Sequence, residues 1–146
     1  MSARYRLHTC SYSEYRPGMG VGVRASLGTP RWIKRETPWP YVREIAPHGS
    51  YLNVPSLAEF YDRYLHQLET HGAARIGRRF AEIAAAHPGP EVVDLVLLCF
   101  EKLSKAGAEC HRTFFARWWT EQTGEQVDEL GAPPAQDALF DPGAAS

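Results

Sequence analysis

The sequence predicts a single α/β domain with three layers, in which a mostly parallel sheet is flanked by helices. An apolar run over residues 92–100, broken only by Asp94, is typical of a strand that is buried on both faces of a parallel sheet. Amphipathic helical segments precede and follow this run, and such alternation favours an α/β architecture. Because the chain has only 146 residues, we expect one domain over residues 1–130. Residues 131–146 are rich in alanine, proline and glycine, which predicts a disordered tail.

Three further strands are predicted around this central one. β-forming residues alternate over residues 5–12, where we expect the first strand, beside the apolar run. After a loop with proline and glycine, residues 21–26 predict a short second strand with Val23 and Arg24 on opposite faces. If this strand adjoins the first one, Arg24 faces the same crevice. Residues 126–130 predict a short final strand.

Three segments have the period of amphipathic helices. The first, residues 57–70, follows Ser56, which has Glu59 three positions later in the form of a capping box. The second covers residues 73–87, and the third covers residues 111–122. We expect the first and third helices to pack on the sheet. The side chains expected to face the core are Leu57, Phe60, Tyr61, Tyr64, Leu65, Leu68, Ile76, Phe80, Ile83, Ala84, Phe114, Phe115, Trp118 and Trp119.

Residues 28–55 form the least regular part of the sequence. Five prolines break it repeatedly. It also carries Trp32, Trp39 and Tyr41, so it is too apolar for a solvated linker. We predict an ordered loop packed against the body, which is either functional or a structural cover over one sheet edge.

Composition argues against several classes of protein. The formal net charge is −1, which argues against a general nucleic-acid binder. No apolar run approaches the roughly 20 residues of a membrane span, and the N-terminus lacks the apolar core of a signal peptide. The cysteines and histidines lack the spacing of zinc ligands, so neither a metal nor a cofactor is predicted. Three cysteines without close pairing favour a reducing, cytoplasmic environment.

The predicted site lies at the carboxyl ends of the strands, because ligands of open α/β sheets bind in the crevice there. Glu101 follows the apolar run directly, and Cys110, His111 and Arg112 stand at the start of the third helix. The first N–H groups of a helix are unsatisfied and its dipole favours negative charge. An anion is therefore the expected occupant.

Three of these residues are candidates for catalysis. Cys110 could be a thiolate nucleophile at the helix start, or a small residue at a tight junction. Glu101 could act as an acid, a base or a nucleophile, or form a salt bridge that fixes the loop. His111 could be a base, although a lone histidine is more often a hydrogen-bonded structural residue.

Five residues are candidates for binding the substrate. Arg112 is expected to clamp the anion, with Arg24 as a second fork. Ser11 and Tyr12, at the end of the first strand, would reach the same crevice. Trp32 would hold the rest of the ligand from the proline-rich loop.

Four segments carry a resemblance to a known family: Leu-Leu-Cys-Phe-Glu-Lys (97–102), Cys-His-Arg (110–112), Arg-Ala-Ser-Leu-Gly-Thr-Pro-Arg-Trp (24–32) and Phe-Tyr-Asp-Arg-Tyr-Leu (60–65). They resemble motifs of the domain-of-unknown-function family 488, over roughly residues 5–123. The resemblance implies a small bacterial α/β domain and brings no established reaction. Residues 103–108 resemble an insertion, so Glu101 and Cys110 are not expected to be locked rigidly together.

The function predicted from these features is an enzyme that acts on a small anionic substrate, such as a nucleotide, a nucleoside or a sugar phosphate. The alternative is a non-catalytic module that binds an anion or nucleic acid, with residues 31–35 as basic and aromatic contacts; nucleic acid is less favoured. A third possibility is a structural protein with Trp32 and Trp39 in an interface. The sequence predicts no oligomeric state.

Overall fold

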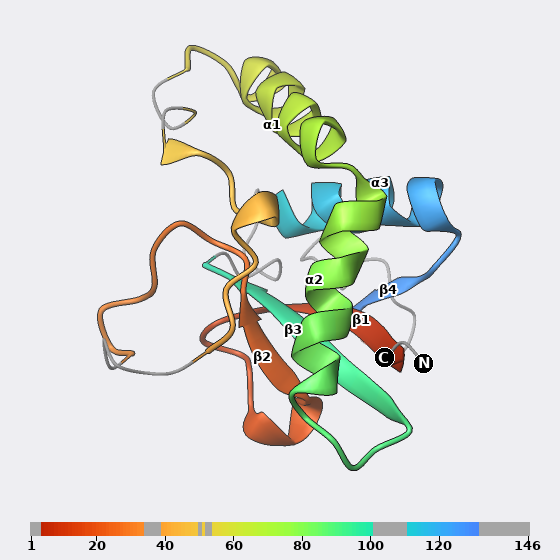
Figure 1. Ribbon diagram of the computed structural model, residues 1–146. Coiled ribbons are helices and arrows are strands. Elements are labelled where there is room, and N and C mark those ends of the chain that lie inside the picture. Colours follow the sequence, from red (N-terminus) through yellow and green to blue (C-terminus); the bar gives the residue numbers. More distant parts are fainter. Residues whose placement is uncertain (1–3, 34–38, 50, 52–53, 101–110, 132–146) are drawn as a thin grey trace, which may run out of the picture.

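The computed structural model describes residues 4–33, 39–49, 51, 54–100 and 111–131. Within this part, four strands form an all-parallel sheet in the order β2-β3-β1-β4 (Figure 1). This arrangement confirms the predicted α/β class. The predicted tail, apart from residue 131, lies outside the described residues. The strands are β1 (Arg4–Ser11), β2 (Val21–Arg24), β3 (Val92–Cys99) and β4 (Val127–Glu129).

The centre of the sheet is the predicted pair of neighbours, β1 and β3. They run in parallel register from Arg4 opposite Val92 to Ser11 opposite Cys99. Alternate residues of β3 enter two different apolar clusters, so both faces of the strand are buried. Burial of both faces explains why the sequence of β3 is apolar at every position except Asp94.

The second strand does not adjoin the first. β2 pairs with β3, with Arg24 opposite Leu98, and the other side of β1 is taken by β4. The condition under which Arg24 would face the same crevice, β2 beside β1, is therefore not met. The physical reason is that β3 and β4 already occupy both sides of β1. Arg24 is thus separated from Ser11 by the width of β3.

Three α-helices accompany the sheet. Ser56 begins the first as predicted, because its Oγ accepts a hydrogen bond from the Glu59 N–H at 3.1 Å. Gly72, at φ 82°, ends the first helix and precedes the second. Gly124, at φ 77°, ends the third. The helices are α1 (Leu57–His71), α2 (Ala73–Ala85) and α3 (His111–Thr123), with short 3₁₀ turns η1 (Pro17–Met19) and η2 (Arg43–Ile45).

The two faces of the sheet are covered differently. The main core lies between one face and the helices, and the buried side of α2 is the predicted one: Ile76, Phe80, Ile83 and Ala84. The cluster on the other face includes loop residues such as Tyr12, Tyr15, Met19 and Trp39. Among the described residues, the layer on that side is therefore formed by loops and η1.

The first helix departs from its predicted position. α1 packs chiefly against η2 and α2 (Figure 1), where we expected it directly on the sheet. Only Tyr64 and Leu68 are buried, and Leu57 is 53% exposed. Tyr64 Oη donates a hydrogen bond to the Ile45 carbonyl at 2.6 Å, so the proline-rich loop is the partner of α1. In the described part of the chain, no helix is long and apolar enough to cross a membrane.

Candidate functional site

All four strands are parallel, so their carboxyl ends meet at one edge of the sheet. β1 ends at Ser11, β2 at Arg24, and α3 begins nearby at His111. Of the predicted site residues, Glu101 and Cys110 lie outside the described residues. The proposed chemistry of these two side chains stays a prediction.

Arg112 is directed into the protein. Its side chain is 1% exposed, and its Nε lies 2.8 Å from Oε1 of Glu129. Nη2 lies 3.3 Å from Oε2 of the same carboxylate, and Nη1 lies 3.2 Å from Sγ of Cys99. Such a two-pronged pair is strong and fixes geometry. The guanidinium that we predicted as an anion clamp is thus committed to an internal carboxylate.

Glu129 has further partners at the end of β4. Its carboxylate accepts hydrogen bonds from Thr9 Oγ1 at 2.8 Å and from the Gly131 N–H at 2.9 Å. The Glu14 carboxylate accepts one from Ser11 Oγ at 2.7 Å. A Cβ built on Gly131 would lie 2.7 Å from an oxygen of each glutamate. Ser11, a predicted ligand contact, is therefore part of this internal polar network.

The cysteines at this edge are not free nucleophiles. Cys10 is buried, and burial, with the Glu129 and Glu14 charges, raises the pKa of its thiol to about 11. A thiol with that pKa is almost entirely protonated at neutral pH. Cys99 is disulfide-bonded, so its sulfur is not a free thiol. The interpretation of the cysteines as unpaired therefore does not hold for Cys99.

His111 forms a short contact across the edge of the sheet. Its Nε2 lies 2.6 Å from the Ala25 carbonyl oxygen. Burial lowers the pKa of the imidazole to about 4, a shift that the Ala25 hydrogen bond opposes and the Arg112 charge increases. The ring is therefore neutral at pH 7, and Nε2 carries the proton that it donates to the carbonyl. This bond joins the start of α3 to the residue after β2.

Tyr12 and Arg24 have partners in the loops that follow β2, and no hydrogen bond joins them to Glu129 in the described part of the chain. Tyr12 Oη lies 2.7 Å from Ser26 Oγ, and its ring stacks on Trp39 at 5.8 Å between centroids. The Arg24 guanidinium lies 4.3 Å from the centre of the Tyr41 ring and donates to the Leu27 carbonyl at 3.2 Å. Among the described residues, its buried Nε has no hydrogen-bond partner.

Trp32, the remaining predicted contact, points outward. It is 64% exposed, the largest exposed fraction among the described large apolar side chains that face solvent. Arg24 lies close enough to the Tyr12 hydroxyl for its hydrogen bond and its charge to offset part of the rise that burial causes in the Tyr12 pKa. Arg112 lies in the separate network around Glu129. The predicted binding residues therefore do not form one anion site.

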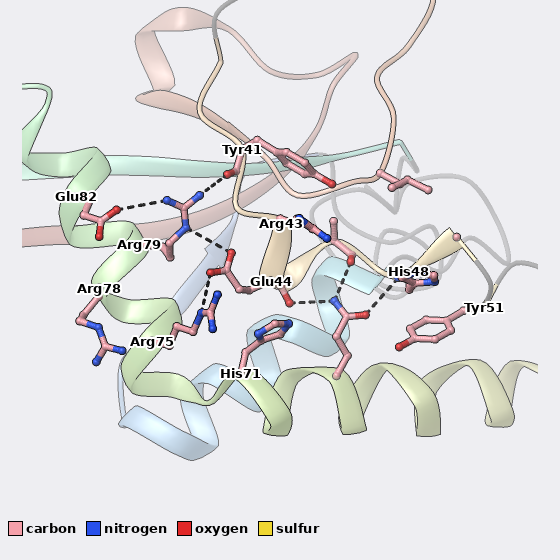
Figure 2. Close-up of a pocket in the computed structure, with 14 residues that line it drawn as sticks. Tyr41, Arg43, Glu44, His48, Tyr51, His71, Arg75, Arg78, Arg79 and Glu82 are labelled. Atoms are coloured by element: carbon pink, nitrogen blue, oxygen red, sulfur yellow. Dashed lines mark hydrogen bonds and ion pairs between the residues drawn. The ribbon is translucent and has the colours of Figure 1, made fainter.

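A larger hollow lies beside the helices. It is a groove of about 1050 Å³ between α1, α2 and the loop that carries η2 (Figure 2). We call it the arginine groove, because arginines from the loop and from α2 line it. Its lining residues are Leu27, Tyr41, Arg43, Glu44, Ala46, His48, Gly49, Tyr51, Gln67, His71, Arg75, Arg78, Arg79 and Glu82.

Glu44 organises the floor of the arginine groove. Its side chain is 7% exposed and lies 3.2 Å from Nε of Arg75 and 3.4 Å from Nε of Arg79. Burial alone would raise the pKa of this carboxyl, but a backbone hydrogen bond and the two arginines outweigh it and lower the pKa. Arg79 also donates to the Tyr41 carbonyl at 2.8 Å and pairs with Glu82 at 3.3 Å. Arg79 is thus fully engaged within the protein.

The other arginines of the groove are less engaged. Within the described residues, no hydrogen bond or ion pair involves the side chain of Arg43 or Arg78, and the side-chain bonds of Arg75 use only its Nε. Next to them, α2 begins at Gly72 without a capping side chain and has no acidic residue in its first turn. Uncapped N–H groups and the helix dipole add to the positive potential there.

The arginine groove was not predicted from the sequence. Arg75, Arg78 and Arg79 are spaced so that they share one face of a helix, and that spacing was the available signal. A basic run of this kind usually forms a solvated face of a helix, so the spacing alone does not indicate a groove. The opposite wall comes from an irregular loop whose position no periodicity determines.

The comparisons provide no relative from which to transfer a role. A scan of family models and searches of characterised proteins and solved structures found no match to this chain. The resemblance to the domain-of-unknown-function family 488 therefore stays a prediction. Among the described residues, no group of three histidine, cysteine, aspartate or glutamate side chains is placed to hold a metal ion.

Proposed function

We propose that this protein binds a small anionic ligand in the arginine groove. The observation that carries the proposal is the position of Arg43 and Arg78 on the walls of a concave surface, without a partner in the described part of the chain. Four arginines and two glutamates line the groove, which leaves a surplus of positive charge. Concave surfaces with such a surplus concentrate anions.

The groove is prepared for a ligand before it binds. Glu44 holds Arg75 and Arg79 through their Nε atoms, so the remaining N–H groups of Arg75 stay available at a fixed place. An arginine that is already positioned loses less entropy on binding than one that is free in solvent. The fully engaged Arg79 then serves to hold the wall rather than the ligand.

Binding at the groove agrees with the non-catalytic alternative from the sequence. The enzymatic hypothesis depends on Cys110 and Glu101, and it stays a prediction that Cys110→Ser and Glu101→Gln would test. Support for Arg112 as the anion clamp is weak, because its guanidinium is buried against Glu129. We therefore propose the arginine groove, and not the carboxyl ends of the strands, as the anion site.

Titration calorimetry with pyrophosphate tests the proposal. We expect saturable binding that weakens as salt is added, because partly exposed charges are screened. Arg78→Gln and Arg43→Gln should each weaken binding roughly tenfold, since one charge-assisted hydrogen bond contributes about 1.5–3 kcal/mol. Arg117→Gln is the matched control, because Arg117 is exposed on α3 and does not line the groove. The absence of binding, or an equal loss in all three variants, would contradict the proposal.

A further inference from the structure

We infer that the ligand of the arginine groove is a nucleoside phosphate, with its phosphates at the arginine end and its base at the opposite end. This inference rests on the proposed function and adds the class of ligand. Three observations support it: the two ends of the groove differ in chemistry, the groove is larger than a phosphate group, and its aromatic end is held in place by packing.

The two ends of the groove differ in chemistry. Figure 2 shows Arg75, Arg78 and Arg79 at one end and His48 and Tyr51 at the other. Phosphate oxygens suit the first end, because guanidinium groups bind them with paired hydrogen bonds. A planar base suits the second, because aromatic side chains stack on bases of any sequence.

The aromatic end is held in place by packing. The rings of His48 and Tyr51 lie 5.8 Å apart, and the Tyr51 ring meets Phe60 edge-on at 6.2 Å. Two aromatic neighbours limit the orientations that the Tyr51 ring can adopt. A base that stacks there would therefore meet a surface that is already ordered.

Gln67 fixes the loop that carries this end. Its amide donates to the carbonyls of Glu44 at 3.0 Å and Ala46 at 2.8 Å, and its Oε1 accepts from the His48 N–H at 3.2 Å. One side chain of α1 thus holds three successive parts of the loop. The distance between the two ends of the groove is set by this attachment.

The size of the groove exceeds what a single phosphate group needs. A volume of about 1050 Å³ is at the upper end of the range for small-molecule sites, roughly 300–1,000 Å³. The lining also includes Tyr41, Ala46 and Leu27, which offer apolar contact. His71 supplies a polar group that a ribose can meet.

A nucleoside phosphate fits these observations better than a nucleic-acid strand. A strand needs positive charge that continues along the protein surface, and the whole chain has a formal net charge of −1. The surplus of positive charge here is local to one groove. A compact ligand with its charge at one end matches that distribution.

Titrations with pyrophosphate and with adenosine diphosphate separate the inference from the proposed function. We expect the nucleotide to bind roughly tenfold or more tightly than pyrophosphate, as stacking on one aromatic side chain would give. If pyrophosphate binds and the nucleotide binds no more tightly, the inference is wrong and the proposed function stands. If neither binds, both are wrong.

Two substitutions of one residue locate the base. Tyr51→Leu should remove the advantage of the nucleotide and leave pyrophosphate binding within about twofold, whereas Tyr51→Phe should keep the advantage because the ring is retained. Arg78→Gln should weaken both ligands. Nuclear Overhauser contacts between the base protons and the Tyr51 ring in the unmodified protein provide a second measurement. Contacts to other aromatic residues alone, or a ten-nucleotide RNA that binds more tightly than the nucleotide, would overturn the inference.

Discussion

The Arg112 guanidinium lies against the Glu129 carboxylate, with Nε 2.8 Å from Oε1 and Nη2 3.3 Å from Oε2. This pair joins the first turn of α3 to the end of β4, across the edge where ligands of parallel sheets usually bind. Arg112 is 1% exposed, so its charge is balanced inside the protein. The pair is therefore a structural connection between two elements.

Arg112→Ala should lower the free energy of unfolding by about 3–5 kcal/mol, because removing one partner leaves the other charge without compensation. Urea denaturation measures this loss. Pyrophosphate affinity should stay unchanged in the fraction that remains folded, since Arg112 does not line the groove. Arg112→Lys should recover only part of the stability, because an ammonium group cannot form the two-pronged pair. If the Arg112→Ala protein were stable and bound pyrophosphate more weakly, Arg112 would be a ligand of the anion and this expectation would be wrong.

His111 should make the protein less stable in mild acid. Its pKa in the folded protein is about 4, below its ordinary value of about 6.5. Between these values the unfolded chain binds a proton that the folded protein does not, so stability falls as pH decreases through this window. The slope should reach at most about 1.4 kcal/mol per pH unit. Denaturation midpoints measured from pH 7 to pH 4 would show it.

The control for this pH dependence is His111→Gln. The glutamine Nε2 lies about as far along the side chain as the imidazole Nε2, so it can still donate to the Ala25 carbonyl, but it does not titrate. The variant should therefore have a flatter stability profile between about pH 6.5 and pH 4 than the unmodified protein. Identical slopes in the two proteins would assign the acid sensitivity to other groups.

Gly20 should tolerate no side chain. Its φ is 141°, and a Cβ there would lie 2.6 Å from the Asp94 carbonyl oxygen. Gly20→Ala combines backbone strain with this clash, and we expect a loss of about 1–3 kcal/mol or more. Gly18→Ala is the control, because a Cβ at Gly18 meets nothing within 4 Å. Thermal melts of the two variants should differ clearly, and equal melting temperatures would contradict the expectation.

Periodicity predicted much of this fold. The apolar run corresponds to β3, and the buried side of α2 consists of the predicted residues. Both predictions succeed because the spacing of apolar residues reflects which side chains face a core. The capping residue Ser56 was also predicted, since its hydrogen bond is local. In each case the signal is local: the spacing of apolar residues along one element, or a capping bond over three residues.

The failures involve residues that are distant in the sequence. Nothing local determines that β2 lies beside β3, or that Arg112 meets Glu129. The arginine groove has the same origin, because Glu44 lies 31 residues from Arg75. A charged residue in a helical pattern has the same appearance whether it faces solvent, a groove or an internal carboxylate. Only the tertiary arrangement distinguishes these cases.

Glu44→Gln should have opposite effects on stability and on binding. The change keeps the shape of the side chain and removes its charge, so the interactions with Arg75 and Arg79 weaken. We expect the free energy of unfolding to fall by about 1–3 kcal/mol. Pyrophosphate affinity should rise severalfold, because the amide oxygen can still accept from the Nε of Arg75 and keep it in place, while the positive potential of the groove is less balanced. Urea denaturation and calorimetry on the same samples measure the two effects.

Two comparisons make this expectation specific to Glu44. Its pKa in the folded protein is lowered from 4.5, so its contribution is present above that pH and is lost as pH falls below it. The difference in stability between the two proteins should therefore shrink in acid below about pH 4.5. Glu82→Gln removes a charge of the same groove, but Glu82 is 66% exposed, so this variant should leave stability nearly unchanged. If Glu44→Gln weakens pyrophosphate binding while the protein stays folded, the carboxylate itself holds the groove in its binding shape.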